Sequence, residues 1–456
     1  MWKHEFVTPV PKVYPPKSPD DLRKIACTKN LSKIYEALLS DNIIKDITPN
    51  IDRAQFGNKA GLSTTHYLVK MINRILTALD SNSSTEKYAV VAQLIDWSKA
   101  FDRQDATLGI EAFISCGVRP SMIPILISFF QDRTMTVKWH GCVSSSRNLP
   151  GGSPQGSTFG LLQYDVNSNS NASHIPQDSK FKFVDDLSTL EIINLLMMGI
   201  CSYNLRNHVA SDVSVDQKFI PNENLASQQY LDQIQNWTIQ NKAKLNVDKS
   251  KVMIFNFCQD YQFSTRLYIG NSLLDTIHET KLLGTIVTSD LKWNSNTNML
   301  VRKAFMRMQI LHKLNSFSVG QEDLKTIYIL YIRSILEQNC QVWHFSLSEE
   351  DRSSLERVQK VAFKVILQSE YTDYENALEV LQLKTLDERR TDLCLKFAKK
   401  SLKQPVASEM FPMNNSSGHF TRKQEKFKVQ RARTSRLRDS SIPQMQRLLN
   451  EHTKKL

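Results

Sequence analysis

Apolar residues at helical spacing dominate the first and last parts of the chain. Residues 31–45 and 61–80 place apolar side chains three and four positions apart, the period of an amphipathic helix. The first stripe contains Leu31, Ile34, Tyr35, Leu38 and Leu39. The second contains Leu68, Val69, Ile72, Ile75, Leu76 and Leu79. From about residue 298 the pattern indicates long helices, one of which carries Leu355, Val358, Ala362 and Val365 on one face.

Strands are predicted between these helical parts. Residues 88–96 form a strongly apolar strand, and residues 181–190 predict a hairpin that bends at Asp185 and Asp186. Further strands are expected at 137–143, 251–257, 266–269 and 282–287, helices near 105–116, 121–131 and 225–240, and a glycine-rich loop at 149–156. The pattern therefore predicts an α+β fold.

Two of the apolar runs end in carboxylates, at Asp96 and at Asp185-Asp186. An unpaired buried carboxylate is costly, so several of them at strand ends favour a bound cation. Clustered aspartates with two Mg²⁺ ions are what phosphoryl transfer to a growing nucleic acid needs. An aspartate pair alone is not specific, because Asp20-Asp21 follows Ser-Pro and is typical of a turn or helix start.

Charge and cysteine content narrow the class of protein. The net charge is +12, and residues 418–456 contribute +8 of it through eleven Lys or Arg against three acidic residues. This tail, from Arg422 to Arg438 with Phe420 and Phe427, predicts either phosphate binding or a solvated, disordered segment. Seven dispersed cysteines form no zinc motif and suit reduced thiols in the cytoplasm or nucleus, and no apolar run approaches a membrane span.

Seven short motifs occur in an order that is specific as a set. They are Pro9-Val10-Pro11-Lys12 with Asp21-Leu22-Arg23-Lys24-Ile25-Ala26; Gln55-Phe56-Gly57-Asn58-Lys59-Ala60-Gly61-Leu62-Ser63-Thr64; residues 94–102; residues 149–156; Phe183-Val184-Asp185-Asp186; residues 245–251; and Leu282-Leu283-Gly284 with Leu291-Lys292-Trp293. In this order they resemble the reverse transcriptase domain of non-LTR (LINE-type, jockey-like) retrotransposons, over about residues 8–370. Two basic positions of the second motif are replaced, by Ala60 and Leu62.

The resemblance implies a right-hand polymerase. Its parts are helical fingers at 1–87, a palm with an antiparallel sheet flanked by helices at 88–260, primer-grip strands at 261–297, a helical thumb at 298–370 and a basic helical region at 371–456. Thumb helices could hold a duplex through Arg302, Lys303, Arg307 and Lys313, or could simply pack together.

The resemblance also assigns residues to roles. Asp96 and Asp185, assisted by Asp186, would hold two Mg²⁺ ions (Mn²⁺ is an alternative), and Lys249 would protonate the leaving pyrophosphate. The predicted nucleotide contacts are Arg23, Lys59, Phe101, Gln155 and Gly156, with Phe101 excluding a 2′-hydroxyl. Each has a simpler reading: surface charges for the three cations, a core aromatic for Phe101, and a turn for the loop.

The predicted function is RNA-directed DNA synthesis from an RNA template, a DNA primer and dNTPs, inside the cell as a cytoplasmic ribonucleoprotein and in the nucleus. One alternative is a catalytically inactive, retrotransposon-derived nucleic-acid-binding protein. Another is an RNA-dependent RNA polymerase or intron maturase, which Phe101 and the long helical region argue against. Because no endonuclease or RNase H motif is evident, we expect a truncated copy that polymerises but cannot nick a target. The sequence gives no indication of oligomeric state.

Overall fold

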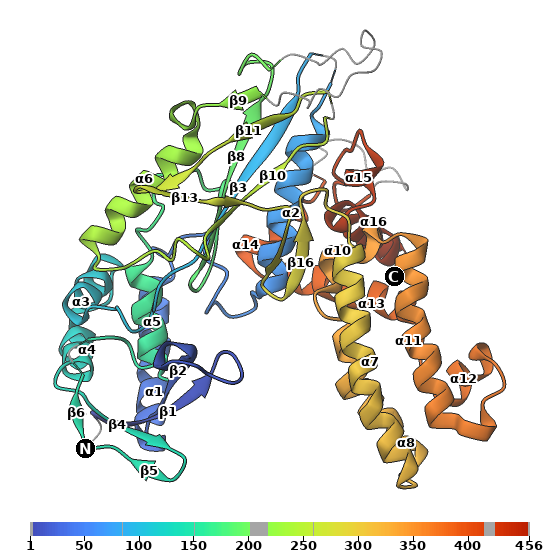
Figure 1. The fold of residues 1–456 in the computed structure, drawn as a ribbon, viewed down its shortest axis with the longest axis horizontal. Coiled ribbons are helices and arrows are strands. Elements are labelled where there is room, and N and C mark those ends of the chain that lie inside the picture. Colours follow the sequence, from blue (N-terminus) through green and yellow to red (C-terminus); the bar gives the residue numbers. More distant parts are fainter. Residues whose placement is uncertain are drawn as a thin grey trace.

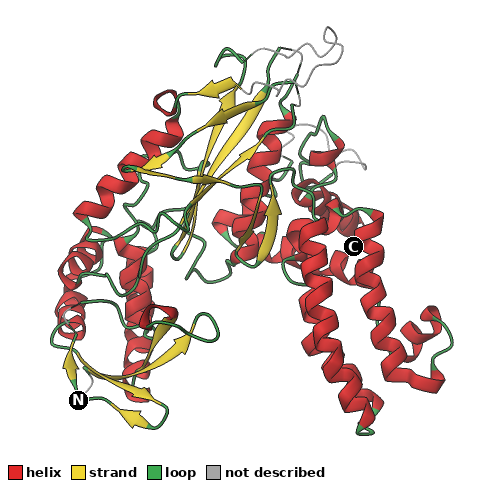
Figure 2. Ribbon diagram, viewed as in Figure 1, coloured by secondary structure: helices red, strands yellow, loops and turns green. Residues whose placement is uncertain are grey.

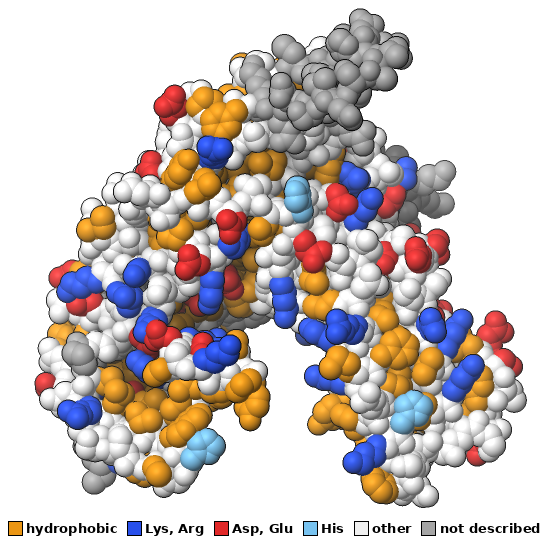
Figure 3. Space-filling model, in the orientation of Figure 1, with side chains coloured by type: hydrophobic (Ala, Val, Ile, Leu, Met, Phe, Trp, Pro, Cys, Tyr) orange, Lys and Arg blue, Asp and Glu red, His pale blue; other side chains and the backbone are white. Residues whose placement is uncertain are grey.

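The computed structural model has the shape of an arch, with a central sheet and two arms (Figure 1). It describes residues 3–83, 85–149, 151–200, 218–258, 260–414 and 425–454. The N-terminal arm combines strands and helices, whereas the C-terminal arm is built from helices (Figure 2). The space-filling view shows a wide opening between the arms (Figure 3).

The central sheet has the strand order β14-β10-β3-β8-β7. Its members are β3 (Tyr88–Ile95), β7 (Lys180–Phe183), β8 (Asp186–Asn194), β10 (Lys251–Phe255) and β14 (Asp275–Thr276). Val90 and Ala92 of β3 face the core around helix α2 (Thr64–Asp80), while Ala89 and Val91 face the core around α6 (Ala226–Gln240). Because both faces are covered, β3 is apolar almost throughout, as the sequence predicted.

The N-terminal arm contains a second sheet, of order β2-β1-β4-β5, with β6 also paired to β4. Its strands are β1 (His4–Pro11), β2 (Leu22–Cys27), β4 (Thr134–Trp139), β5 (Cys142–Val143) and β6 (Arg147–Asn148), beside helices α1 (Asn30–Ile47), α3 (Ala106–Ser115), α4 (Ile123–Phe130) and α5 (Thr158–Asn167). The region predicted as helical fingers, residues 1–87, therefore also contains the strands β1 and β2. The predicted strand at 137–143 is in fact two strands joined through His140 and Gly141, both with positive φ.

Helix α1 forms where predicted but presents the opposite face to the core. Leu31, Ile34 and Leu38 are 67%, 57% and 70% exposed, whereas Ser32, Glu36 and Ser40 are buried. Glu36 accepts hydrogen bonds from Ser32 Oγ (3.3 Å) and from the Phe159 amide (3.2 Å) in the first turn of α5. The inward face is mixed: Glu36 meets the start of α5, which offers unpaired N–H groups, while Ile43 and Ile47 further along the helix are buried in a hydrophobic core.

Helices α7 (Asn294–Ser316), α8 (Gln321–Ile327), α11 (Glu349–Leu367) and α12 (Tyr374–Val380) form the C-terminal arm. The predicted apolar face of α11 is confirmed, since Leu355, Val358, Ala362 and Val365 are all buried. The predicted strand at 282–287 is instead a hairpin of β15 (Glu279–Leu282) and β16 (Thr285–Thr288). The smaller strands are β9 (Lys218–Ile220), β11 (Phe263–Thr265), β12 (Tyr268–Ile269) and β13 (Ser272–Leu273).

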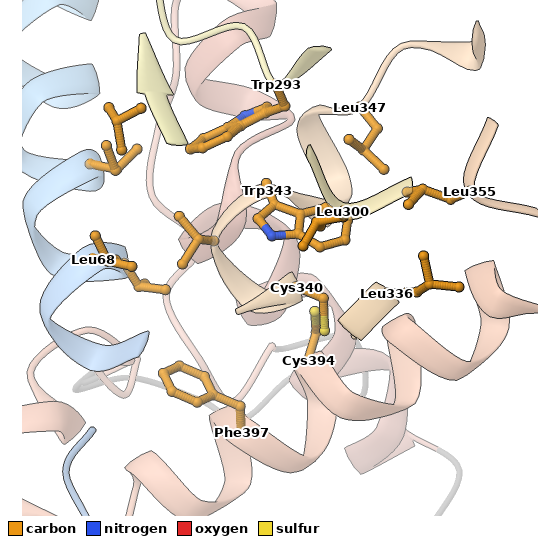
Figure 4. Close-up of a cluster of buried hydrophobic side chains, with 14 of the residues drawn as sticks. Leu68, Trp293, Leu300, Leu336, Cys340, Trp343, Leu347, Leu355, Cys394 and Phe397 are labelled. Atoms are coloured by element: carbon orange, nitrogen blue, oxygen red, sulfur yellow. The ribbon is translucent and has the colours of Figure 1, made fainter. Parts of the chain in front are cut away.

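One large core joins the central sheet to the C-terminal helices. The predicted stripe of α2 is buried in this core. Residues of α10 (Cys340–Trp343), α13 (Leu386–Ser401) and α16 (Ser441–Lys454) are buried in it as well. The short helices of the same region are α9 (Ser334–Leu336), α14 (Pro405–Ser408) and α15 (Ser435–Arg438). Figure 4 shows Leu68 of α2 on one side of Trp343, with Cys340 and Cys394 beside each other as free thiols. Across the described ranges, no helix combines the length and apolar character that crossing a membrane requires.

Candidate active site

The β7–β8 hairpin carries Asp185 and Asp186 at its turn. Phe183 pairs with Asp186, so Val184 and Asp185 form a two-residue turn. Val184 has φ of +55°, which matches the first turn position of a type II′ hairpin. Glycine is favoured at that position, and a β-branched residue there is strained. The hairpin bend that the sequence predicted at the two aspartates is confirmed.

The register of the sheet brings Asp96 to the same end as this turn. Ile95 of β3 pairs with Leu187 of β8, so Asp96 follows the pair on one strand and Asp186 precedes it on the other. The loop at 245–250 secures Asp96: its amide donates to Ser250 Oγ (3.1 Å), and its carbonyl accepts from the Asn246 amide (2.9 Å). Asp96 and the Asp185-Asp186 pair, which are far apart in sequence, therefore lie at the same end of the sheet.

The pKa values of these acids are raised, so their surroundings compensate the negative charges only in part. Burial, followed by the charges of Asp185 and Asp96, raises the pKa of Asp186 to about 7. The pKa of Asp96 is raised by burial and by Asp185, although Lys249 opposes the shift. Burial also raises the pKa of Asp185, against the charge of Arg23. We call Asp96, Asp185 and Asp186 the acid group. Its repulsion favours binding of a cation.

The donor chemistry of the acid group suits a hard divalent ion, since Mg²⁺ and Mn²⁺ prefer carboxylate oxygens. In the described part of the chain, however, no three Asp, Glu, His or Cys side chains are already arranged to hold a metal ion. The residues thus fit a magnesium site by ligand type and by electrostatics, and their side chains do not form a ready-made ligand shell.

Phe101 and the glycine-rich loop lie beside the acid group. The Phe101 ring stacks on Tyr164 of α5, with ring centres 4.7 Å apart. Burial, followed by the charge of Asp185, raises the pKa of Tyr164, which places this ring near the acids. The Phe101 carbonyl accepts a hydrogen bond from the Ser153 amide (2.9 Å), which attaches the loop to this aromatic pair.

Gln155 and Gly156 connect the loop to strand β2. The Gln155 carbonyl accepts from the Ala26 amide (2.8 Å), and its side chain donates to Asp102 (3.4 Å). Gly156 has φ of +127°, and a Cβ there would lie 2.6 Å from the Ala26 carbonyl oxygen. Glycine is therefore required at this position by the fold, whatever the loop binds.

The three predicted cations occupy different surroundings. Arg23 and Lys249 are exposed and act electrostatically on Asp185 and Asp96, respectively. The Lys59 ammonium instead donates to the carbonyl of Asp52 (2.8 Å), and burial lowers the pKa of Lys59. Contact of Lys59 with a nucleotide would require this hydrogen bond to be exchanged.

Sequence reasoning missed a buried ion-pair group under the same hairpin. Lys180 and Lys182 of β7 are buried and lie 3.1 and 2.9 Å from Asp52. Lys182 also donates to the carbonyls of Ser168 and Asn169, each at 3.2 Å. The sequence does contain an indication of this ion-pair group: in Lys180-Phe181-Lys182-Phe183 the two residue types alternate, so both lysines lie on one face of the strand and both phenylalanines on the other.

The basic tail is folded where it is described, so of the alternatives left open for it, disorder does not apply to residues 425–454. Asp80 at the end of α2 accepts from the amides of Arg433 and Thr434, each at 2.8 Å. Phe427 and Leu437 are buried in the large core. The Arg436 guanidinium lies 3.8 Å from the centre of the Phe257 ring. Arg422, Lys423 and Phe420 lie outside the described residues.

Comparison with known proteins adds relatives of named activity. No protein-family model matches the chain. It is 27% identical over 293 residues to the RNA-directed DNA polymerase from mobile element jockey of Drosophila funebris, covering 62% of this chain and 29% of that protein. It is 23% identical over 386 residues to the probable RNA-directed DNA polymerase from transposon BS of Drosophila melanogaster, covering 81% and 39%. The resemblance inferred from the motifs is confirmed.

The chain spans 29% to 39% of the length of these two relatives. Among solved structures, apo telomerase from Candida tropicalis has a TM-score of 0.44 at 11% identity, covering 90% of this chain and 68% of that one. The RNA-dependent RNA polymerase of a human picorbirnavirus has a TM-score of 0.40 at 11% identity, covering 86% and 64%. Similarity at this level does not assign the fold, which rests on the α+β arrangement described above.

Proposed function

We propose that this chain is the polymerase part of a reverse transcriptase from a non-LTR retrotransposon, which extends a DNA primer on an RNA template with dNTPs. The observation that carries the proposal is the acid group: three carboxylates with raised pKa values at one end of the sheet, in a chain similar to RNA-directed DNA polymerases. The location, in the cytoplasm as a ribonucleoprotein and in the nucleus, is part of the proposal and rests on the reduced cysteines.

The proposed architecture is a right hand. The N-terminal arm acts as fingers, the central sheet as palm and the C-terminal arm as thumb. Template and primer would occupy the opening between the arms, where basic side chains gather along the inner edge of the C-terminal arm (Figure 3). Basic side chains suit a phosphate backbone, which supports this placement.

Asp96 and Asp185, with Asp186, would hold two Mg²⁺ ions, with Mn²⁺ as an alternative. When bound, such ions lower the pKa of the primer 3′-hydroxyl and stabilise charge on the transferred phosphate and on pyrophosphate. The chain itself orients the acids through the β3–β8 register and the loop at 245–250. Arg23 supplies positive charge for the triphosphate and Lys249 a proton for the leaving group.

Phe101 and the loop around Gln155 and Gly156 would receive the nucleotide. A ring at Phe101 held flat against Tyr164 leaves little room for a 2′-hydroxyl, which favours dNTPs over rNTPs. Gly156 allows the loop backbone to lie against β2, so that the loop surface is fixed beside the acids.

The test is primer extension on an RNA template with Mg²⁺ and dNTPs, using wild type and Asp185→Asn. We expect Asp185→Asn to lower extension at least about a thousandfold, because a negative charge that the transition state needs is lost. Asp323→Asn, on the exposed surface of α8, is the matched control and should extend as wild type does. Folded wild-type protein that binds RNA but extends no primer would instead support the inactive nucleic-acid-binding alternative.

A further inference from the structure

The turn that carries Asp185 adopts a conformation that its own sequence disfavours. Val184 occupies the left-handed region with φ of +55°, where a β-branched side chain is strained. Such a conformation persists only where the surroundings determine it. The contacts of this one residue therefore decide where the next two side chains, both members of the acid group, are directed.

Gln55 makes the contact that holds this turn. Its side-chain oxygen Oε1 accepts from the Val184 amide (3.1 Å) and from the Gly57 amide (2.9 Å). Gln55 is 2% exposed, so both bonds lie out of water. Within the described residues, no other hydrogen bond to the Val184 amide is present.

The backbone around Gln55 is fixed to the strand that enters the turn. The Phe56 amide donates to the Lys182 carbonyl (2.8 Å), and the Lys182 amide donates to the Ala54 carbonyl (2.9 Å). Gln55 is thereby aligned beside Lys182, two residues before Val184, and its side chain reaches the turn. The ion pairs of Asp52 with Lys180 and Lys182 also attach the segment before Gln55 to this strand.

Gly57 leaves the space that this contact needs. A Cβ on Gly57 would lie 2.6 Å from both the amide nitrogen and the Cγ2 atom of Val184. The amide nitrogen is a backbone atom and cannot move without shifting the turn. Here glycine is required because of space and not because of its φ, since Gly57 is not among the residues with positive φ.

We propose that Gln55 is a positioning residue, which clamps the Val184 amide and so sets the direction of Asp185 and Asp186 relative to Asp96. The inference rests on the proposed function, because it assigns Gln55 a part in the work of the acid group. Gln55 is buried, so it acts through the turn. A residue that merely satisfies a buried amide would affect stability alone.

The experiment compares Gln55→Met, Gln55→Glu and Gly57→Ala with wild type. Methionine has a similar length but accepts no strong hydrogen bond, whereas glutamate keeps a side-chain oxygen acceptor, and burial raises the pKa of a carboxyl group and keeps it neutral. In primer extension we expect kcat to fall about ten- to a hundredfold in Gln55→Met with little change in KM for dNTP, a fall in Gly57→Ala, and near wild-type kcat in Gln55→Glu.

Val358→Ala, in the buried face of α11, is the matched control for lost stability. If Val358→Ala, matched to Gln55→Met in thermal stability, loses as much kcat, the role of Gln55 is structural and the proposal is overturned. Wild-type kcat in Gln55→Met would overturn it as well.

A second readout does not depend on activity. Hydrogen exchange of the Val184 amide should be at least about tenfold faster in Gln55→Met and restored in Gln55→Glu, and the Mg²⁺ concentration for half-maximal thermal stabilisation should rise in Gln55→Met. Unchanged exchange and an unchanged Mg²⁺ response would overturn the clamp even if wild type extends primers. If wild type extends no primer but Gln55→Met still shows faster exchange and a weaker Mg²⁺ response than wild type, the proposed function is contradicted and the clamp remains supported.

Discussion

Two groups of charges meet at the same β-hairpin, and they are balanced in opposite ways: the side chains of the first are buried, whereas those of the second are partly exposed. In the ion-pair group, Asp52 is held by Lys182 and Lys180. Burial alone would raise the pKa of Asp52, but the charge and hydrogen bond of Lys182 outweigh it, and the pKa lies well below its usual range. In the acid group, burial and mutual repulsion act in the same direction, and the pKa of Asp186 is about 7.

The difference separates a structural group from a functional one. The Asp52 group is closed: both ammonium groups are buried, with Lys182 bonded to the carbonyls of Ser168 and Asn169 and Lys180 to that of Ala172. The cations that act on the acid group, among them Arg23 and Lys249, are exposed and offset its raised pKa values only in part. Acids whose pKa values a fold raises in this way are typical of sites that bind a charged ligand.

The largest expected effect comes from breaking the compensated group. Asp52→Asn leaves two buried ammonium groups without a counter-charge and should lower the free energy of unfolding by about 3–5 kcal/mol. Denaturant unfolding followed by circular dichroism measures it. Glu322→Gln, which removes an exposed ion pair with Lys325, should change the same quantity by less than about 0.5 kcal/mol. Equal stability of Asp52→Asn and wild type would show that the lysines reach water.

Neutralising one member of the acid group should raise the free energy of unfolding instead of lowering it. The pKa of Asp186 is raised in the fold, so its contribution to stability is present below the unfolded pKa of about 4 and is lost as pH rises through about 7. Without metal, Asp186→Asn should therefore be more stable than wild type by about 1–3 kcal/mol at pH 8 and equal to it below pH 4. A difference that is the same at both pH values would contradict the raised pKa.

Added Mg²⁺ should compensate the negative charge of the acid group, as Lys180 and Lys182 compensate that of Asp52. An ion that binds the folded acid group stabilises wild type by about 1–3 kcal/mol when present at ten to a hundred times its Kd. Thermal unfolding at pH 8 with and without Mg²⁺ measures this, and the double variant Asp185→Asn/Asp186→Asn should not respond. A response of equal size in the double variant would place the ion elsewhere.

The smallest expected effect concerns the choice between dNTPs and rNTPs beside the acid group. Phe101→Val removes the ring that stacks on Tyr164 and should raise the use of rNTPs relative to dNTPs by about tenfold, which is about 1.4 kcal/mol in selectivity. Competitive incorporation of labelled nucleotides measures the ratio. If overall synthesis falls while the ratio stays constant, Phe101 is a packing residue, as its simpler reading holds.

The sequence alone located most elements, because local periodicity carries that information. The helix at residues 64–80, the strand that ends before Asp96 and the hairpin at Asp185-Asp186 all occur where predicted. The pattern failed for α1, whose apolar stripe is exposed. Periodicity shows that a helix has two faces but not which of them has a partner, and here buried Glu36 meets the start of α5.

The sequence by itself determined which residues could form a polymerase site, since the motifs around Asp96, Phe101, Gln155 and Asp185 are local and ordered. Only the tertiary structure decided how the charges are balanced. Lys182 forms an ion pair with Asp52, and Asp186 is repelled by Asp185 and Asp96. The strained turn at Val184 is held by a hydrogen bond to Gln55, 129 residues away in sequence. The reason is physical: compensation and strain depend on distance and burial, which chain order does not encode.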